Sequence, residues 1–283
     1  MRELNLIKLE AADIPPLLEV SASAGWPTTA ETWSTMLGIR GGAFFGHRLA
    51  DGEIVSSAGI FNYGKLASLA MVLVKPSHRG RGLAKQLVTH CSAQLPPAAA
   101  IMLVSTELGL PLYTRLGFKP VDGTQRLTLT GTPKPLNAAR ARFIRPYTAA
   151  DFRGVLNADA AALGVRREGV IRACVSEAGP CFVLTDGDRI TGFGAAKDGP
   201  GGRAIGPVIA PDAEAAMCLV ESLPAANGAK LQIDALAGRT EFLKALAARG
   251  FTVEGAAPIL LLNGEGLPGR RENIFAIASR AYG

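Results

Sequence analysis

The sequence predicts a mixed α/β protein built from two similar halves. Three observations support this prediction: short apolar segments alternate with helical patterns, hairpin turns recur at corresponding places, and one succession of elements occurs twice in 283 residues. A chain of this length suits two domains. Hydrophobic residues make up 48% of the chain and charged residues only 19%, a balance that argues against intrinsic disorder.

The first half shows the full succession of elements. In order, it reads as strands at 43–49, 53–61 and 69–74, a helix at 80–95, a strand at 101–105 and a short helix ending at Gly117. Asp51-Gly52, between the first two strands, is a strong hairpin signal. Pro76 follows the third strand, and a glycine such as Gly117 supplies the left-handed residue that closes a helix.

The second half repeats this order. It reads as strands at 181–185, 189–196 and 205–210, a helix at 212–223, a strand at 231–234 and a short helix ending at Gly250. The stretch 131–141 between the halves contains two prolines and no apolar periodicity, which is typical of a linker. The repeat therefore predicts two domains, residues 1–130 and 142–283, joined by that linker.

The charge pattern limits the classes of partner. The net charge of +6 comes from 30 basic and 24 acidic residues, spread so evenly that they do not form the basic stripe typical of nucleic-acid binding. No apolar run approaches the 18 residues of a membrane helix, and Glu3 stands where a signal peptide would be basic. We expect a cytoplasmic protein that binds neither nucleic acid nor membranes and has charge suited to a small anionic cofactor.

The cysteines give no sign of a metal site. Cys91, Cys174, Cys181 and Cys218 show no C-x-x-C spacing, and the three histidines offer few further ligands. Structural zinc sites usually draw on clustered Cys and His side chains. We therefore expect reduced thiols in a reducing compartment and no bound metal.

The junction between the third strand and the first helix carries the clearest chemical signal. Two glycines, Gly80 and Gly82, let the backbone approach a ligand closely. Exposed amides at a helix N-terminus attract phosphate, and Arg79, Arg81 and Lys85 add positive charge there. The spacing matches neither a P-loop nor a Rossmann loop. It indicates a pyrophosphate site of another kind, the alternative being a helix start that binds no ligand.

This junction resembles that of a known family. Arg79-Gly-Arg-Gly-Leu-Ala84 matches the R/Q-x-x-G-x-G/A signature of the GNAT acetyltransferases, and Pro111–Phe118 is similar to the second helix of that superfamily. The resemblance implies two GNAT-like domains, each with a central mixed, mostly antiparallel sheet flanked by helices. The tandem layout is similar to a GNAT subgroup with a second, GNAT-like domain at the C-terminus, here in a degenerate form.

The resemblance also implies where acetyl-CoA would bind as co-substrate. Backbone groups of the third strand would pair with the pantetheine arm, and amides of the glycine loop would hold the pyrophosphate. Thr106 would lie near the cofactor arm. The implied cofactor-binding residues are Val72, Leu73, Val74, Arg79, Gly80, Arg81, Gly82, Leu83, Ala84, Lys85 and Thr106.

Acetyl transfer to an amine needs a stabilised oxyanion, a proton donor for the leaving sulfur and a neutral attacking amine. The resemblance gives Tyr113 the role of proton donor, while packing of its ring with a wetted hydroxyl is the alternative. No acid lies in the third or fourth strand, where many members of the family carry a base. Glu107 is the nearest carboxylate, with His47, His78 and ordered water as the alternatives.

An acceptor site is expected over the stretch 25–33, which contains both tryptophans. Trp26 and Trp33 are seven residues apart, so they either form an aromatic wall for the acceptor or pack together on the sheet from one helix face. Asn62, beyond the hairpin, is a further candidate for acceptor binding. Asp234, at a strand end in the second half, is either an anchor for the acceptor amine or a cap.

The second half lacks both the glycine loop and the tyrosine. Pro211–Met217 replaces the loop, and Leu246 stands opposite Tyr113. We expect this half to complete the acceptor pocket or an interface, and a homodimer is left open. Because the predicted machinery lies in one half, residues 1–135 alone are expected to bind acetyl-CoA.

The predicted function is acetyl transfer from acetyl-CoA to a primary amine. A small-molecule acceptor is favoured because the second domain would cover the site, whereas a bulky acceptor needs an open groove. A protein N-terminus and a lysine side chain are the alternative acceptors. A non-enzymatic acyl-CoA sensor is the alternative of another class, because the strand acid is missing.

Overall fold

The computed structural model describes residues 4–26, 28–131, 143–176, 179–199, 201–223 and 229–283. The strands of the first half are β1 (Leu4–Lys8), β2 (Gly42–Leu49), β3 (Ile54–Asn62), β4 (Leu66–Val74), β5 (Ala100–Val104) and β6 (Lys119–Thr130). Its helices are α1 (Ile14–Ser23), α2 (Ala30–Gly38), α3 (Leu83–Ala93) and α4 (Leu110–Arg115). The predicted linker, 131–141, lies outside the described residues apart from Gly131.

The second half contains the same kinds of element in a similar order. Its strands are β7 (Ile144–Pro146), β8 (Cys181–Asp186), β9 (Arg189–Gly199), β10 (Gly202–Ile209), β11 (Lys230–Leu236), β12 (Thr252–Leu262) and β13 (Ile274–Ala276). Its helices are α5 (Phe152–Leu163), α6 (Glu168–Ser176), α7 (Ala213–Glu221) and α8 (Thr240–Ala248). No helix in these described ranges is both long enough and apolar enough to cross a bilayer.

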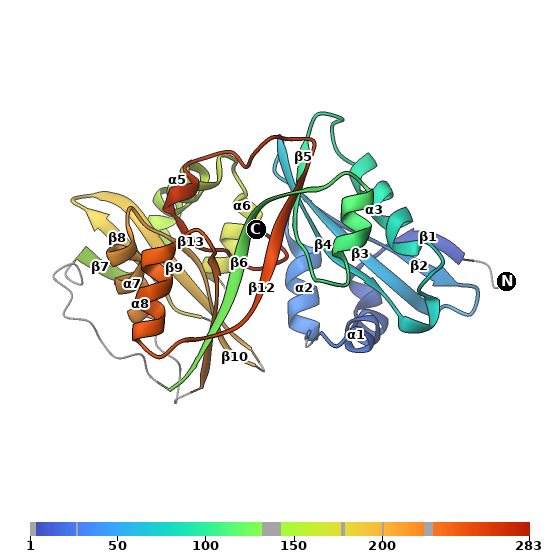
Figure 1. The fold of residues 1–283 in the computed structure, drawn as a ribbon, viewed down its shortest axis with the longest axis horizontal. Helices are drawn as coiled ribbons and strands as arrows, with labels where there is room; N and C mark the ends of the chain where they lie inside the picture. Colours follow the sequence, from blue (N-terminus) through green and yellow to red (C-terminus); the bar gives the residue numbers. More distant parts are fainter. Residues whose placement is uncertain (1–3, 27, 132–142, 177–178, 200, 224–228) are drawn as a thin grey trace.

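The strands of both halves join one thirteen-stranded sheet (Figure 1). The order is β1-β2-β3-β4-β5-β12-β6-β11-β13-β10-β9-β8-β7. Among the strands of the described residues, only the pairings β4–β5 and β10–β11 are parallel. The predicted mixed, mostly antiparallel α/β architecture is therefore confirmed, with the two expected sheets fused into one.

Helix α3 begins later than the helical pattern indicates. The prediction places its start at Gly80, whereas the helix begins at Leu83. Gly80 and Gly82 have φ angles of +78° and +77°, which a right-handed helix does not accommodate. The two glycines therefore form a loop in front of the helix.

Strands β4 and β5 are adjacent but pair over only a short length. Leu66–Ser68 pair with Ala100–Met102, and within the described structure the two strands share no further register partners. The outer edges of both strands stay paired, β4 with β3 as far as Val74 and β5 with β12 as far as Val104. A wedge therefore opens between the carboxyl ends of β4 and β5.

The two halves exchange their last long strands. β12, from the second half, pairs with β5, and β6, from the first half, pairs with β11. β6 and β12 also pair with each other, and they run side by side through the middle of the molecule (Figure 1). Leu260 of β12 is fully buried in the apolar core that contains Leu87 and Ile101. Each half therefore completes the sheet of the other.

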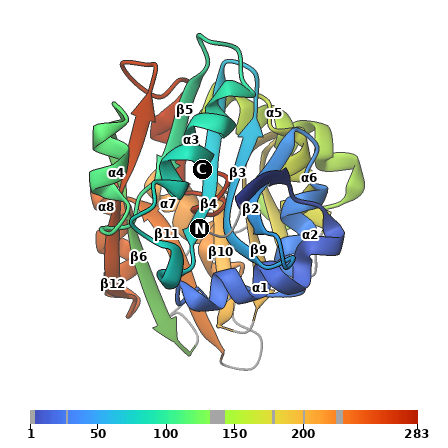
Figure 2. The same cartoon turned by 90° about the vertical axis from the view of Figure 1, so that its right-hand side faces the viewer.

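Helices cover both faces of the first-half sheet (Figure 2). Neighbouring strand residues point to opposite faces, so Phe45 packs in the core under α3 and α4 while Phe44 packs in the core under α1 and α2. The wedge between β4 and β5 thus lies between two helical layers, with α1 on one side and α4 on the other.

The second half has a corresponding parallel pair, but its gap is filled. β10 and β11 pair directly over Arg203–Ile205 and Leu231–Ile233. Beyond these residues β13 lies between the two strands, and Ala276 pairs with Val208 on one side and Ala235 on the other. The chain's own backbone therefore occupies the place that is open between β4 and β5.

The strand exchange predicts that the halves do not fold apart. Residues 1–135 expressed alone should show no cooperative thermal transition by circular dichroism, because β5 loses β12 and the core loses Leu260. This outcome differs from the binding-competent fragment expected from the sequence. Expression together with residues 136–283 should restore a 1:1 complex with a cooperative transition. A monomeric 1–135 fragment that unfolds cooperatively would contradict the importance of the exchange.

Candidate active site

The glycine loop presents an uncapped helix N-terminus. Gly82 is the N-cap of α3, and in the described structure it supplies no side-chain hydrogen bond to the first turn. The amides of Leu83, Ala84 and Lys85 therefore point out of the helix end without intrahelical partners. The matching helix α7 differs, because the Asp212 carboxylate accepts a hydrogen bond of 2.9 Å from the Ala215 amide. Of these two described helix ends, the one at α3 has no side-chain cap and the one at α7 has one.

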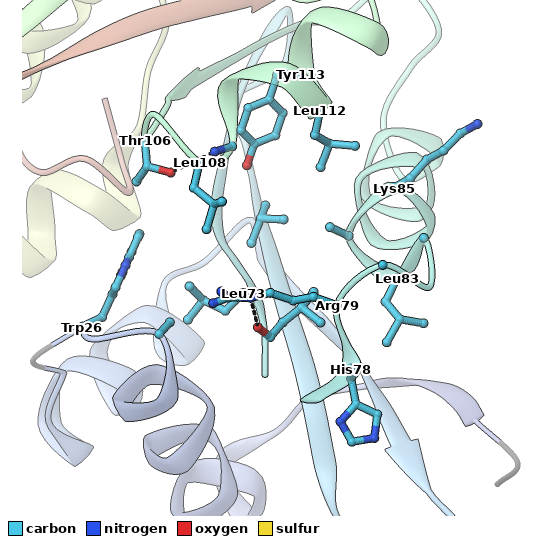
Figure 3. Close-up of a pocket in the computed structure, with 17 residues that line it drawn as sticks. Trp26, Leu73, His78, Arg79, Leu83, Lys85, Thr106, Leu108, Leu112 and Tyr113 are labelled. Carbon is cyan, nitrogen blue, oxygen red and sulfur yellow. Dashed lines mark hydrogen bonds between the residues drawn. The ribbon is translucent and has the colours of Figure 1, made fainter. Parts of the chain in front are cut away.

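A cavity of about 300 Å³ extends from this helix end along the wedge (Figure 3). We call it the glycine-loop cavity. It is lined by all the predicted cofactor-binding residues except Arg81, namely Val72, Leu73, Val74, Arg79, Gly80, Gly82, Leu83, Ala84, Lys85 and Thr106. The structure therefore brings together residues from β4, from the glycine loop and from the segment after β5.

The cationic side chains around the glycine loop point in different directions. Arg79 Nε donates a hydrogen bond of 3.2 Å to the Val74 carbonyl, which holds its guanidinium beside β4 (Figure 3). The Lys85 side chain points outward from the cavity in the same view. Arg81 is exposed and does not line the cavity. His78 lines the rim and hydrogen-bonds to Ser77 Oγ over 2.9 Å.

Tyr113 closes the inner end of the glycine-loop cavity. Its side chain descends from α4, and its hydroxyl points into the cavity (Figure 3). The ring packs edge-on against Phe118, with centroids 5.7 Å apart. Gly109 lies so close that an added Cβ would come within 2.8 Å of Tyr113 Cε2, so only glycine leaves room for this ring position. Burial raises the pKa of the Tyr113 hydroxyl above its usual value, so the phenol stays protonated.

A bulge in β4 turns the backbone beside the wedge. Met71 has a φ of +51°, and the β3–β4 register shifts at this point. Ser57 Oγ donates a hydrogen bond of 2.9 Å to the Met71 carbonyl. The N–H of a trans peptide points opposite to its C=O, so the amide of Val72 is directed away from Ser57.

A second cavity, of about 420 Å³, meets the first. We call it the arginine cavity, because Arg126 and Arg280 are the charged residues that line it. The two cavities share four lining residues: Trp26, Val72, Thr106 and Tyr113. Arg126 belongs to β6 of the first half and Arg280 to the segment after β13, so both halves form the walls of this cavity.

Asp234 lies behind the two arginines. Arg126 donates to it in a bidentate manner, from Nε over 3.0 Å and from Nη2 over 2.7 Å. Arg280 Nε donates to the same carboxylate over 3.1 Å. Asp234 is buried and does not line any described cavity. The predicted anchor for an amine is therefore already paired with two guanidinium groups.

The predicted base, Glu107, does not line either of these cavities. Glu107 is exposed and lines none of the described cavities. Among the described residues, neither the glycine-loop cavity nor the arginine cavity is lined by an Asp or a Glu. His47 is buried away from both cavities and hydrogen-bonds to Ser56 and Gln86. Burial lowers the pKa of His47, so its imidazole is neutral near pH 7.

The two tryptophans have different surroundings. Trp26 is 36% exposed and lines both the glycine-loop cavity and the arginine cavity. Trp33 is fully buried, packs edge-on against Phe44 and donates a hydrogen bond of 3.1 Å from Nε1 to Ser21 Oγ. The structure therefore places one tryptophan at the site and the other in the core under α1 and α2.

Asn62 lies apart from Tyr113. Its Oδ1 accepts a hydrogen bond of 2.8 Å from the Gly64 amide, which closes the turn after β3. The cavity that Asn62 lines is a separate one beside Arg166 and Arg167. Among the described residues, no group of three or more His, Cys, Asp or Glu side chains could hold a metal ion.

Sequence reasoning missed Arg126, Arg280 and Thr28. The first two stand near no recognisable motif, and they meet only because β6 and the C-terminal segment come together in the fold. Thr28 lies within the predicted acceptor stretch, and its hydroxyl is buried in the arginine cavity without a hydrogen-bond partner among the described residues. The one feature of the sequence that pointed to Thr28 was its place, as a polar residue, within that stretch.

Comparisons with known proteins agree with the fold and the site. Two family models, each described as an acetyltransferase (GNAT) domain, match residues 42–120 and residues 155–276. An uncharacterised N-acetyltransferase of Bacillus subtilis (strain 168), YitH, is 29% identical over 280 residues, which are 99% of this chain and 98% of that protein.

Solved structures show the same tandem fold. A putative acetyltransferase from Pyrococcus horikoshii superposes with a TM-score of 0.81 at 18% identity, over 100% of this chain and 97% of that one. A tandem GNAT protein from the clavulanic acid biosynthesis pathway gives a TM-score of 0.64 at 13% identity, over 93% of this chain and 100% of that one. Members of the matched family use acetyl-CoA as co-substrate. The chain belongs to the GNAT superfamily, with two GNAT domains in tandem, and is an acyltransferase of the N-acetyltransferase type.

Proposed function

We propose that this protein transfers the acetyl group of acetyl-CoA to a primary amine of a small molecule, at a site in its first half. The supporting observation is the junction of the glycine-loop cavity with the arginine cavity at Val72, Thr106 and Tyr113. One cavity would hold the cofactor and the other the acceptor. The thioester and the amine would then meet beside Tyr113, as direct transfer requires.

The glycine-loop cavity supplies what acetyl-CoA needs. The free amides of Leu83, Ala84 and Lys85 would bind the pyrophosphate, with the helix dipole and Arg79 adding positive potential. The pantetheine arm would run along the edge of β4 that β5 leaves unpaired beyond Ser68. The acetyl group would thereby reach the inner end of the cavity.

The bulge in β4 would stabilise the transition state. The Ser57 hydrogen bond fixes the Met71 carbonyl on one side, which directs the Val72 amide to the other. Val72 lines both cavities, so we assign its N–H to the thioester carbonyl oxygen, where negative charge develops during attack. A donor held in place by the backbone needs no reorganisation at the moment of reaction.

Tyr113 would serve the leaving sulfur. The neutral amine attacks the thioester carbon, the nitrogen loses a proton and the carbon–sulfur bond breaks. A thiol has a pKa of about 8.5, below that of a phenol at about 10, so a buried phenol is the weaker acid. Tyr113 can therefore give its proton to sulfur only if its oxygen receives another proton at the same time. The proton that the nitrogen releases supplies this second proton. An ordered water molecule would carry this proton from the nitrogen to the Tyr113 oxygen, because neither cavity is lined by a described carboxylate.

The size of the arginine cavity favours a small substrate. The arginine cavity has a volume of about 420 Å³ and is lined by residues of both halves, including Ala281. A volume in this range suits a small molecule. A mass-spectrometric assay with acetyl-CoA should detect acetylation of small amines, while peptides with free N-termini or lysines should react at least tenfold more slowly. Faster acetylation of peptides would contradict the proposal.

A negative charge in the glycine loop should weaken cofactor binding. Gly82→Asp would place a carboxylate at the pyrophosphate site and should weaken CoA binding by about 10- to 100-fold, measured by titration calorimetry. The matched control is Gly52→Asp, in the β2–β3 turn, where φ is +92° and an added Cβ meets nothing within 4 Å. Equal loss in both variants, or unchanged affinity in the first, would contradict the assignment.

Loss of the Tyr113 hydroxyl should affect turnover more than binding. Tyr113→Phe should lower kcat by about 100-fold, the lower end of the range for a positioned proton donor, with the Kd for CoA within about twofold of wild type. Tyr147→Phe, in the second half, makes the same chemical change as a control. Wild-type kcat in the first variant would show that another group or water serves the sulfur.

The raised pKa of Tyr113 predicts how the reaction rate depends on pH. Its phenol donates only when protonated, and burial raises its pKa, so donation should persist as pH rises to about 10. The rate should therefore climb throughout this range, because an alkylamine with a pKa of about 10.4 is still losing its proton at pH 10. Stopped-flow kinetics between pH 7 and 10 would measure this profile. A decline below pH 10 that Tyr113→Phe removes would contradict it.

A further inference from the structure

The charges of the side chains that line the arginine cavity are not balanced by Asp234, the acid that pairs with them. Arg126 and Arg280 share a single carboxylate, that of Asp234, and none of the described residues lining this cavity is acidic. One unit of positive charge is therefore left over. The side chains of Arg126 and Arg280 are 31% and 27% exposed, while that of Asp234 is only 9% exposed, so the excess charge faces the cavity.

Arg126 and Arg280 also have hydrogen-bond donors that the described part of the protein does not use. A guanidinium has five N–H donors. The Asp234 carboxylate accepts hydrogen bonds from Nε and Nη2 of Arg126. It also accepts a hydrogen bond from Nε of Arg280, and Nη2 of Arg280 lies 3.1 Å from it. Within the described structure, the Nη1 group of neither arginine has a hydrogen-bond partner. At least four N–H donors, two from each Nη1, therefore remain for a ligand.

A third polar group in the cavity lacks a partner. Thr28 Oγ1 is buried and makes no hydrogen bond in the described part of the chain. Burying a hydroxyl without a partner is unfavourable, so such groups commonly mark the place of a ligand or a water molecule. Burial lowers the pKa of Arg280, and the neighbouring charge of Arg126 acts in the same direction, as expected where two cations stand close together.

We propose that the acceptor amine carries a carboxylate, and that Arg126 and Arg280 bind this carboxylate while the amine is directed to Tyr113. The proposal rests on the proposed acetyl transfer and specifies its substrate class. A carboxylate supplies the one negative charge that the cavity lacks, and its four lone pairs match the free Nη1 donors. Asp234 would then be a positioning residue that holds both guanidinium groups.

The neighbouring cavity gives this substrate room. A larger cavity of about 800 Å³, which we call the outer cavity, shares Met71, Arg126, Arg280 and Ala281 with the arginine cavity. The arginines thus stand at the boundary between the two spaces. A carboxylate bound there would leave the amine on the inner side, and a substituent on the substrate could extend into the outer cavity.

Matched pairs of amines test the carboxylate directly. β-Alanine, 4-aminobutyrate and phenylalanine should be acetylated with kcat/KM at least tenfold above that of their carboxamides, in which a neutral amide of similar shape replaces the carboxylate. Arg280→Met leaves the Arg126–Asp234 pair intact, so it removes the excess charge without stranding an acid. It should lower kcat/KM for the acids by about 10- to 100-fold, mainly through KM, and leave the carboxamides within about threefold. Arg153→Met, on the exposed side of α5, is the control.

Two further substrates test two alternatives: that the bound anion is a phosphonate, or that it belongs to the acyl donor. 2-Aminoethylphosphonate places a phosphonate where β-alanine has its carboxylate, and its preference over β-alanine would overturn the carboxylate assignment. Succinyl-CoA carries a carboxylate on the acyl group. Faster transfer from succinyl-CoA than from acetyl-CoA to uncharged amines, lost in Arg280→Met, would place the carboxylate on the donor and overturn the proposal.

A binding measurement keeps the proposal independent of turnover. N-Acetyl-β-alanine should raise the melting temperature of the CoA complex of the wild-type protein but not of Arg280→Met, and N-acetyl-β-alaninamide should do so in neither. If this binding pattern holds and no amine is acetylated, the carboxylate site stands and the proposed transfer fails. Absence of the shift in wild type, or its persistence in Arg280→Met, would overturn the inference.

Discussion

The site depends on the separation of β4 from β5. Because the two strands pair only as far as Ser68 and Met102, the edge of β4 from Met71 to Val74 is left for another extended chain. The glycine loop follows β4 directly and aims the amides of α3 at the same space. Tyr113 enters from the segment after β5. The separation of these two strands therefore brings together three stretches of sequence, none of which forms a site alone.

The second half shows what the fold does when the corresponding gap is filled. Its parallel pair opens in the same way, but β13 fills the gap with backbone hydrogen bonds. Asp212 caps the helix that corresponds to α3, and Leu246 is buried where a tyrosine would stand. This half retains the architecture and contributes Arg280 to the arginine cavity. Its role in the first-half site comes from strand exchange and from the segment after β13.

Local patterns predicted the local structure well. Alternating apolar residues and Asp-Gly turns indicated both hairpins, and the glycines of the loop 79–82 indicated the helix end and its lining residues. Contacts between distant segments carried no such signal. β12 lies beside β5, although the sequence gives no reason why β6 should not pair there instead. Arg126 meets Arg280 only because the two halves exchange these strands. Trp33 was ambiguous because one spacing fits both a core face and a cavity wall.

Amide hydrogen exchange with and without CoA tests the central claim most directly, because it reports on both halves of the intact protein in one measurement. The account predicts slowed exchange over residues 72–85, where β4 and the amides of α3 would bind the cofactor, and no change over residues 203–215, where β13 and Asp212 already occupy the corresponding groups. Slowed exchange confined to residues 203–215, or none over residues 72–85, would contradict it.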